Sequence, residues 1–288
     1  MSKKIVILNS IKDITKFEKL CDGFILGIKN LSVNLPNYFS LEEIKENIKL
    51  LKNHNKDLFI CLNKNMHNCD LDNLNYTLKE LSALNIDGII FYDIAIINIC
   101  KKLNLNFNLI WNQEHLVTNY NTINYWQEKG VEFSYLSSEL TLDEILEIRQ
   151  NTTSKLMANV FVYIPMFTSK RPLVNNYLEK FDLKDESKIN YLEKENNVYP
   201  IISKDLTTVY SSKILNLVRE YPIFVDNNIE YLVFNSFNIE EDTFIDVLKL
   251  FNEEDNFKNF DKINMLLDYK IDTGFLYKDT VYKVKKNG

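Results

Sequence analysis

The stretch from Val160 to Phe181 reads VFVYIPMFTSKRPLVNNYLEKF and packs many position-specific residue types into a short space. Its first residues, Val160 to Tyr163, are β-branched or aromatic and predict a β-strand. Pro165 is expected to end that strand, and a polar, basic turn from Thr168 to Arg171 follows. Pro172 fits the first turn of a helix, where no backbone N–H is needed. A strand that leads through a cationic turn into a helix is a typical anion site.

Strands and helices alternate on both sides of this stretch. Several of the strands are apolar without alternation, which is typical of parallel strands covered on both faces. Ser40 with Glu43, and Thr141 with Glu144, form capping boxes at two helix starts, and Gly130 is a stop signal for another helix. The eight predicted strands are Ile5–Asn9, Gly23–Ile28, Leu58–Asn63, Gly88–Tyr92, Phe107–Trp111, Val131–Leu136, Leu156–Tyr163 and Tyr231–Phe237.

Eight strands with intervening helices predict an α/β fold of the (β/α)8 TIM-like barrel type. The alternative is an open, doubly wound sheet. With only six glycines, the chain has neither a GxGxxG motif nor a Walker A loop, so binding of a dinucleotide or phosphoryl transfer by these routes is not expected.

Two additions to the barrel are predicted within a single domain that spans residues 1–288. A β-rich insertion, residues 182–228, lies between strands seven and eight and is interpreted as a flap over the barrel mouth. Its short strands are expected at Ile189–Glu195, Val198–Ser203 and Leu206–Ser211, with polar turns between them. A C-terminal extension, residues 256–288, is expected to hold a helix, Lys262–Tyr269, and short strands at Phe275–Tyr277 and Val281–Val284.

Composition indicates a globular protein that is not a general nucleic-acid binder. The 288 residues carry a formal net charge of −6 and an isoelectric point near 5.3, which leaves room only for a local basic patch. The basic tail Lys283–Lys286 is interpreted either as a solvated tail or as a contact to RNA. Serine and lysines at residues 2–4 lead directly into a strand, and no apolar run reaches the roughly 20 residues of a membrane helix. A cytoplasmic location with reduced thiols is therefore expected.

The cysteines do not indicate a metal site. No CxxC pair and no histidine at zinc-finger spacing is present, and Cys21, Cys61 and Cys100 fit buried free thiols. No Ser-His-Asp, Cys-His or HExxH constellation can be assembled either.

Candidate site residues follow from the rule that barrel active sites lie at the carboxyl ends of the strands. These ends are rich in amides and hydroxyls: Asn9, Asn63, Asp93, Asn112, Ser137, Ser138, Glu139, Tyr163, Asn235 and Ser236. The catalytic candidates are Asn112, Glu139 and Tyr163. The candidates for binding a substrate or partner are Ser169, Lys170, Arg171, Asn175 and Tyr177. Among the histidines, His54 and His67 are expected at the surface, and His115 is the best placed, although a structural role is favoured for it.

Several of these residues have two interpretations. Asp93 and Glu139 can form a carboxylate pair across the mouth, or Asp93 can begin a helix while Glu139 pairs with Arg171. The Lys170–Arg171 pair can bind a phosphate or carboxylate, or be a solvated turn. Tyr163 and Tyr177 can line a pocket or be core aromatics.

The segment VFVYIPMFTSKRPLVNNYL resembles the signature of the U32 peptidase-like family, in which a strand VFVHG runs into a cysteine-containing loop and an LxSNY helix. Leu116–Val131 and Leu136–Ile145 resemble the family's preceding segments, and GFLYKDTVYKVK, Gly274–Lys285, resembles its C-terminal end. The chain is most similar to a short, single-module branch that works with a larger U32 protein. The resemblance implies that the two proteins together make 5-hydroxyuridine at tRNA uridine 34, using prephenate.

This resemblance implies a specific division of labour. Phe167 and Pro172 stand where cluster-bearing members have iron–sulfur ligands, and Tyr163 stands where the family often has histidine. The resemblance therefore implies no cluster on this chain, a cluster on a larger U32 partner, prephenate as co-substrate, tRNA as a further partner and no membrane. The expected function is a hydroxylase component of tRNA modification. The alternatives are a collagenase-like peptidase and a binding protein for a small anion such as prephenate.

Overall fold

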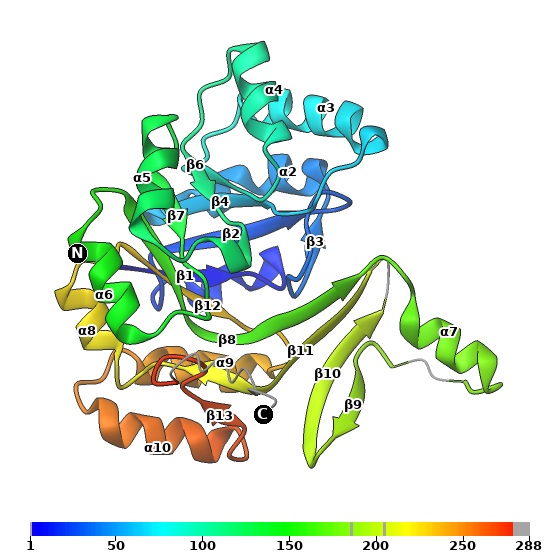
Figure 1. The fold of residues 1–288 in the computed structure, drawn as a ribbon, viewed down its shortest axis with the longest axis vertical. Coiled ribbons are helices and arrows are strands. Elements are labelled where there is room, and N and C mark those ends of the chain that lie inside the picture. Colours follow the sequence, from blue (N-terminus) through cyan, green and yellow to red (C-terminus); the bar gives the residue numbers. More distant parts are fainter. Residues whose placement is uncertain (1, 185–186, 204–205, 279–288) are drawn as a thin grey trace, which may run out of the picture.

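Eight parallel strands form a closed barrel in the computed structural model, which describes residues 2–184, 187–203 and 206–278. The last barrel strand, β12, pairs with both β1 and β8 and so closes the ring. The predicted (β/α)8 architecture with a β-rich insertion between strands seven and eight is confirmed (Figure 1). The barrel strands are β1 Lys3–Ile7, β2 Gly23–Ile28, β4 Asp57–Leu62, β5 Gly88–Phe91, β6 Leu109–Trp111, β7 Phe133–Tyr135, β8 Lys155–Ser169 and β12 Tyr231–Asn235.

Side chains fill the barrel interior, as expected for a ring of eight strands. Ile7, Phe59, Ile90 and Met157 are among the inward-facing residues, and each is at most 5% exposed. At the start of β2, Gly23 is required because a Cβ there would lie 2.6 Å from the carbonyl oxygen of Asp57. The interior is thus a packed core that leaves room only near the mouth.

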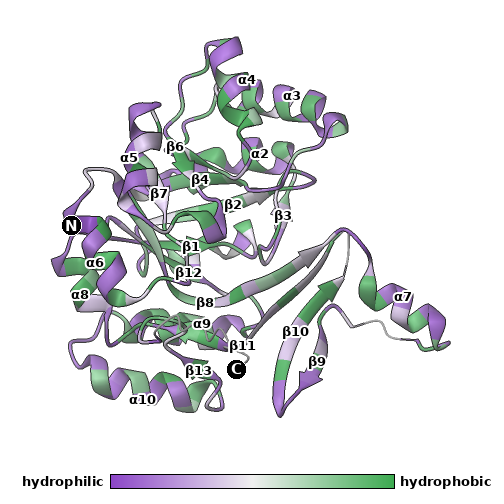
Figure 2. Cartoon of the chain, in the orientation of Figure 1, coloured by the Kyte–Doolittle hydropathy of each residue, from purple (hydrophilic) through white to green (hydrophobic). Residues whose placement is uncertain are grey.

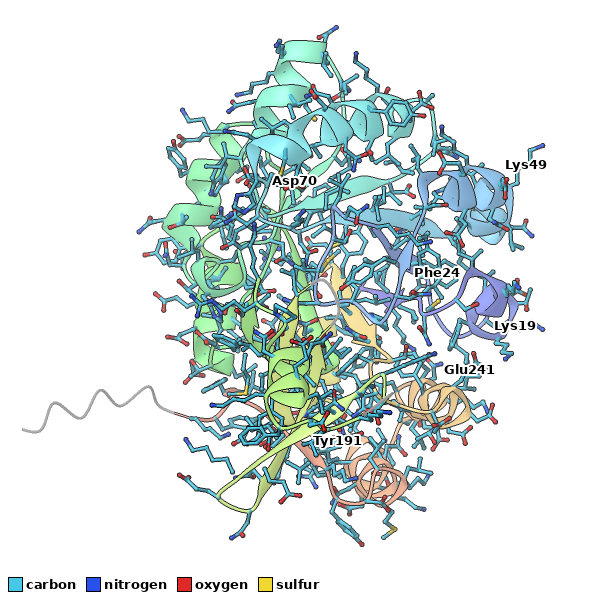
Figure 3. All side chains as sticks on the ribbon, turned by 90° about the vertical axis from the view of Figure 1, so that its right-hand side faces the viewer. Lys19, Phe24, Lys49, Asp70, Tyr191 and Glu241 are labelled. Atoms are coloured by element: carbon cyan, nitrogen blue, oxygen red, sulfur yellow. The ribbon has the colours of Figure 1, made fainter. Side chains whose placement is uncertain are left out.

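Helices cover the outside of the barrel, with their apolar faces toward the strands (Figure 2). Both predicted capping boxes, at Ser40 and Thr141, are present. Figure 3 shows the labelled Lys19 and Lys49 pointing outward, whereas Phe24 lies within the core. The helices are α1 Ile14–Phe17, α2 Leu41–Leu51, α3 Leu71–Leu81, α4 Ala95–Leu103, α5 Tyr120–Glu128, α6 Leu142–Gln150, α7 Leu173–Lys180, α8 Tyr221–Asp226, α9 Glu241–Leu250 and α10 Asn256–Leu266.

Strand β8 does not end at Pro165, contrary to the sequence-based expectation. It continues to Ser169 and pairs antiparallel with β11 (Thr207–Asn216), so that the two strands leave the barrel as a ribbon (Figure 1). Pro165 lies opposite Tyr210, next to shifts in the strand register. Proline is tolerated at such irregularities because no ladder hydrogen bond from its nitrogen is required.

The rest of the insertion extends this ribbon. Strands β9 (Asn190–Lys194) and β10 (Asn197–Ser203) form a hairpin whose Glu195 and Asn196 have φ angles of 50° and 64°, as a tight type I′ turn requires. Helix α7 follows Pro172, which is its N-cap residue, and has no buried residue. We call the described residues between 164 and 213 the flap; it includes the outer parts of β8 and β11 together with α7, β9 and β10. The predicted turn at Lys204–Asp205 lies outside the described residues.

The C-terminal extension differs in detail from the prediction. Helix α10 begins earlier than residue 262, and the short strand β13 (Ile271–Asp272) pairs with β11, while β3 (Tyr38–Phe39) pairs with β2. Residues 275–277 form a turn rather than a strand, because Leu276 and Lys278 donate backbone hydrogen bonds to Thr273 and Phe275. The predicted strand Val281–Val284 and the tail Lys283–Lys286 lie outside the described residues. Among those described, no helix combines the length and apolar character that crossing a membrane needs.

Candidate functional site

A cavity of about 90 Å³ lies at the carboxyl ends of the barrel strands, and we call it the mouth pocket. Its polar lining includes six residues that the strand-end rule selects: Asn63, Asn112, Ser137, Ser138, Glu139 and Asn235. Four further polar residues were not singled out from the sequence: Asn34, Glu114, Tyr135 and Asn159. His115, the best placed of the three histidines, also lines the pocket. The pocket therefore offers mainly amides and hydroxyls, together with two carboxyl groups and one imidazole.

Asn112 lines this pocket and carries a buried acceptor without a partner among the described residues. It follows β6 directly, and its backbone N–H donates to the carbonyl of Phe91 at 2.8 Å. The side-chain Oδ1 is buried and has no hydrogen-bond partner among the described residues. A buried acceptor without a partner costs on the order of 1–3 kcal/mol, so this arrangement is typical of an atom that serves a ligand.

His115 and Glu139 meet at the rim, with Nδ1 and Oε1 3.1 Å apart. Glu139 thus pairs with His115 and not with Arg171, which had been the alternative expected for it. Both side chains are about half exposed, so the pair adds little to stability. An imidazole held by a carboxylate can accept or return a proton from a bound substrate.

Glu114 adds a second carboxyl group beside this pair. Its Oε1 accepts a long hydrogen bond of 3.5 Å from the amide of Asn34, and burial raises the pKa of Glu114. The sequence signal that was missed is the run Trp111 to His115, in which four polar residues in a row follow a buried strand end. Of these, Asn112 was selected as a catalytic candidate and His115 was noted as the best placed histidine, whereas Glu114 was overlooked.

A chain of hydrogen bonds lines the floor of the pocket. The hydroxyl of Tyr135 donates to Asn159 Oδ1 at 2.6 Å, and Asn159 Nδ2 donates to the hydroxyl of Ser138 at 2.9 Å. Burial raises the pKa of Tyr135 well above its ordinary value, so its phenol keeps the proton that it donates. The available signal was the single amide in the apolar run Leu156–Tyr163.

Comparison with known proteins assigns the chain to a family. The model of peptidase family U32 matches residues 14–272. The chain belongs to peptidase family U32. The solved structure of the U32 peptidase Mk0906 superimposes with a TM-score of 0.55 at 13% sequence identity, covering 83% of this chain and 95% of that one. That likeness concerns the fold.

Several relatives carry names from tRNA hydroxylation. The Bacillus subtilis tRNA hydroxylation protein P2 is 28% identical over 285 residues, which cover 90% of this chain and 92% of that protein. The B. subtilis tRNA hydroxylation protein P1 is 22% identical and the Escherichia coli protein P is 27% identical. This U32 chain spans only 48% and 41% of the lengths of P1 and P, whereas it matches P2 over 92% of that protein.

Tyr163 of this U32 chain does not line the mouth pocket. It is 5% exposed and packs edge-on against Phe237, with ring centroids 5.9 Å apart. Its neighbours Val162 and Ile164 face the pocket instead. Burial raises the pKa of Tyr163 to about 12, and the residue is a core aromatic, as one of its two interpretations proposed.

The predicted binding residues lie on the flap, outside the mouth pocket. Ser169 Oγ accepts from the backbone N–H of Arg171 at 3.1 Å, and Asn175 is exposed on α7. The carbonyl of Arg171 accepts from Thr207 at 2.6 Å, while its side chain is exposed. Tyr177, 57% exposed, rests against Phe181. Lys170 lines a different hollow, and its Nζ contacts Nε2 of His67.

Metal ligands are scarce in the part of the chain that the structure describes. It holds no group of three or more histidine, cysteine, aspartate or glutamate side chains that could bind a metal ion. Cys21, Cys61 and Cys100 are buried, and burial raises the pKa of Cys61 to about 12, which disfavours the thiolate that ligation needs.

Asp93 has a structural role near the mouth. Its Oδ1 accepts from the backbone N–H of Ala95 at the start of α4, and its Oδ2 accepts from that of Met66, both at 2.9 Å. This agrees with the interpretation that Asp93 begins a helix. The carboxylate pair with Glu139 is not formed, because Glu139 contacts His115.

Proposed function

We propose that this U32 chain is a component of tRNA hydroxylation that holds substrate while a larger U32 partner carries the redox centre. The observation that carries the proposal is the match to tRNA hydroxylation protein P2 over 92% of that protein's length. The site supports the same division of labour, because its pocket supplies hydrogen-bonding groups and an imidazole. The positions of Phe167 and Pro172 supply no cluster ligand.

Within the mouth pocket, the amides and the His115–Glu139 pair would have different roles. Asn112 and the Tyr135–Asn159–Ser138 chain would bind polar groups of the substrate, because their donors and acceptors have fixed directions. The His115–Glu139 pair, 3.1 Å apart, would move a proton at the rim. This proposal includes prephenate as the co-substrate and the wobble uridine of tRNA as the target. It also includes the cytoplasm as the location of the reaction.

The partner is proposed to be a longer U32 protein with an iron–sulfur cluster. Two B. subtilis relatives of different length, P1 and P2, fit a system with two U32 chains. Affinity purification of the tagged chain from its native host, followed by mass spectrometry and iron analysis, tests this point. Recovery of the chain alone, free of iron, would contradict it.

The function itself is tested by deleting the gene in the native host and measuring 5-hydroxyuridine in digested tRNA by mass spectrometry. The modification is expected to fall, and to return when the wild-type gene is supplied in trans. Unchanged 5-hydroxyuridine in the deletion strain would rule the proposal out. No hydrogen bond joins an imidazole to a hydroxyl or thiol nucleophile among the described pocket residues, so the geometry does not favour a peptidase.

A further inference from the structure

A second hollow, of about 590 Å³, lies between the loop after β2 and the flap. Three lysines line it: Lys29 and Lys64 from the barrel side, and Lys170 from the end of β8. We call this hollow the lysine groove. It adjoins the mouth pocket, because Asn34 lines both. On a chain with a net charge of −6, three lysines around one hollow are a local concentration of positive charge.

Carboxylates neutralise two of these lysines but not the third. Lys64 lies 2.8 Å from Asp70, and Lys29 lies 3.5 Å from Glu43. Lys170 has no carboxylate within ion-pair distance among the described residues, and its Nζ instead contacts the imidazole of His67. The groove therefore contains one cation, Lys170, that pairs with no acidic side chain in the described part of the chain. The imidazole of His67, which this cation contacts, lies at the edge of the groove.

Both groups are held in place by the backbone. Lys170 follows Ser169, the last residue of β8, which is paired with Thr207 in the ribbon. The N–H of His67 donates to Asp70 Oδ2 at 2.9 Å at the start of the 3-10 turn Asn68–Asp70. The neighbouring acidic residue, Asp70, is labelled in Figure 3. Two exposed side chains from elements far apart in sequence thus converge, each on a backbone segment that hydrogen bonds hold.

The contact between an ammonium and an imidazole nitrogen has a clear chemical consequence. A neutral ring accepts a hydrogen bond from the ammonium group at Nε2, whereas a protonated ring repels that group. An oxyanion that bridges the two groups removes this repulsion and gains two charge-assisted hydrogen bonds. The arrangement therefore favours a bound oxyanion.

We propose that the lysine groove binds an oxyanion, a phosphate or a carboxylate, through Lys170 and His67. This inference rests on the proposed function, because that function supplies the two sources of the oxyanion. The oxyanion belongs either to a free small carboxylate or to the phosphate backbone of RNA. Asn34 separates the groove from the mouth pocket, so the anion would lie next to the pocket in either case. Lys170 rather than Arg171 is the anion ligand in this arrangement.

Binding to the purified full chain tests the proposal. Malonate and inorganic phosphate form one arm of the titration, and an anticodon stem–loop RNA forms the other. Calorimetry gives the dissociation constants, and the histidine signals in NMR spectra report on the groove. With only three histidines in the chain, the imidazole of His67 can be assigned by the His67→Gln variant. We expect binding in at least one arm, with a shift of the His67 signal.

Lys170→Gln is expected to weaken binding about tenfold, the effect of losing one charge-assisted hydrogen bond. Lys180→Gln is the matched control, because Lys180 is exposed on α7 and lies over the ring of Phe181. Lys170→Arg keeps the charge and should retain most of the binding. For RNA, Lys170→Gln should also reduce the slope of log affinity against log salt by about one.

The outcomes separate the two sources of the anion. Binding of malonate or phosphate that RNA does not displace assigns the site to a small anion, and binding of RNA that competes with phosphate assigns it to the nucleic-acid backbone. No binding in either arm, or equal loss in Lys170→Gln and Lys180→Gln, overturns the proposal. Anion binding together with unchanged 5-hydroxyuridine in the deletion strain would leave the site standing and reject the proposed function.

Discussion

The hydroxyl of Thr208 donates a hydrogen bond of 2.8 Å to Oδ1 of Asn34, a residue 174 positions earlier in the chain. The same amide contacts Thr168 of β8 and donates to Glu114 in the mouth pocket. One asparagine side chain therefore connects both strands of the ribbon to the barrel mouth. Its φ of 59° is a left-handed conformation, which asparagine adopts more readily than most residues.

Removing this connection should loosen the flap. Thr208 is 5% exposed, so Thr208→Val leaves the acceptor on Asn34 with weaker partners and should lower the free energy of unfolding by about 1–2 kcal/mol. Denaturation with guanidinium chloride measures the change. Thr153→Val is the control, since the exposed Thr153 bonds only to Gln127 on the outer surface. Equal stability of the two variants would contradict the role given to Thr208.

Asn112 should be a residue whose loss harms activity but not stability. Its Oδ1 is buried without a partner, so Asn112→Leu should keep or raise the free energy of unfolding while lowering 5-hydroxyuridine in the complemented deletion strain. Asn63→Leu is the matched control at another strand end. Asn63 bonds to both the N–H and the carbonyl of Val33, and its loss should cost about 1–3 kcal/mol. A large loss of stability in Asn112→Leu would refute this assignment.

The His115–Glu139 pair should matter for function only. Because both side chains are about half exposed, His115→Gln should change the free energy of unfolding by less than about 1 kcal/mol. It should nevertheless reduce 5-hydroxyuridine in tRNA. Lys249→Gln breaks an equally exposed ion pair, with Asp246 on α9, and should change neither quantity. Full modification in the His115→Gln strain would remove the proton-transfer role.

The buried carboxyl of Glu114 should make stability depend on pH. Burial raises the pKa of Glu114, so the native state keeps this proton to higher pH than the unfolded chain does. The contribution of Glu114 to stability is therefore complete below about pH 4.3, the unfolded pKa, and is lost as pH rises through the higher native pKa.

Glu114→Gln removes this dependence, so the variant should gain stability relative to the wild type between about pH 4 and about pH 7. Denaturant midpoints at the two pH values give the difference. Glu128→Gln, at an exposed position on α5, controls for the loss of one carboxyl. A variant that tracks the wild type at both pH values would show that Glu114 does not titrate in this way.

The sequence contained enough information for the barrel and for half of the mouth pocket. Apolar strands, capping boxes at Ser40 and Thr141, and the strand-end rule depend on local patterns, which the structure retains. Glu114 and Asn34 were missed because neither directly follows a strand: Glu114 begins a 3-10 turn, and Asn34 lies in the long loop after β2. Pro165 was misread because its tolerance depends on the register irregularity opposite Tyr210, which only the paired strand creates.

A bulge in β8 explains why Tyr163 is a core aromatic and does not line the pocket. Asn159 pairs with Val233 and Phe161 with Phe234, so β8 holds one extra residue between the two pairs. Such a bulge reverses the alternation of the side chains that follow it. Asn159 therefore faces the pocket, and beyond the bulge Val162 and Ile164 face it in place of Tyr163.

The ring closes below the flap, and this has a consequence for how such proteins can diverge. Strand β12 joins β8 only through Met157–Phe161, and the flap begins beyond that point. The barrel is thus complete without its flap. The groove-forming part can be exchanged between members as a cassette, with cuts after Tyr163 and before Ile214, while every ladder of the barrel stays intact. Transplanting the flap of a longer U32 relative onto this barrel is therefore a structurally defined way to swap specificities.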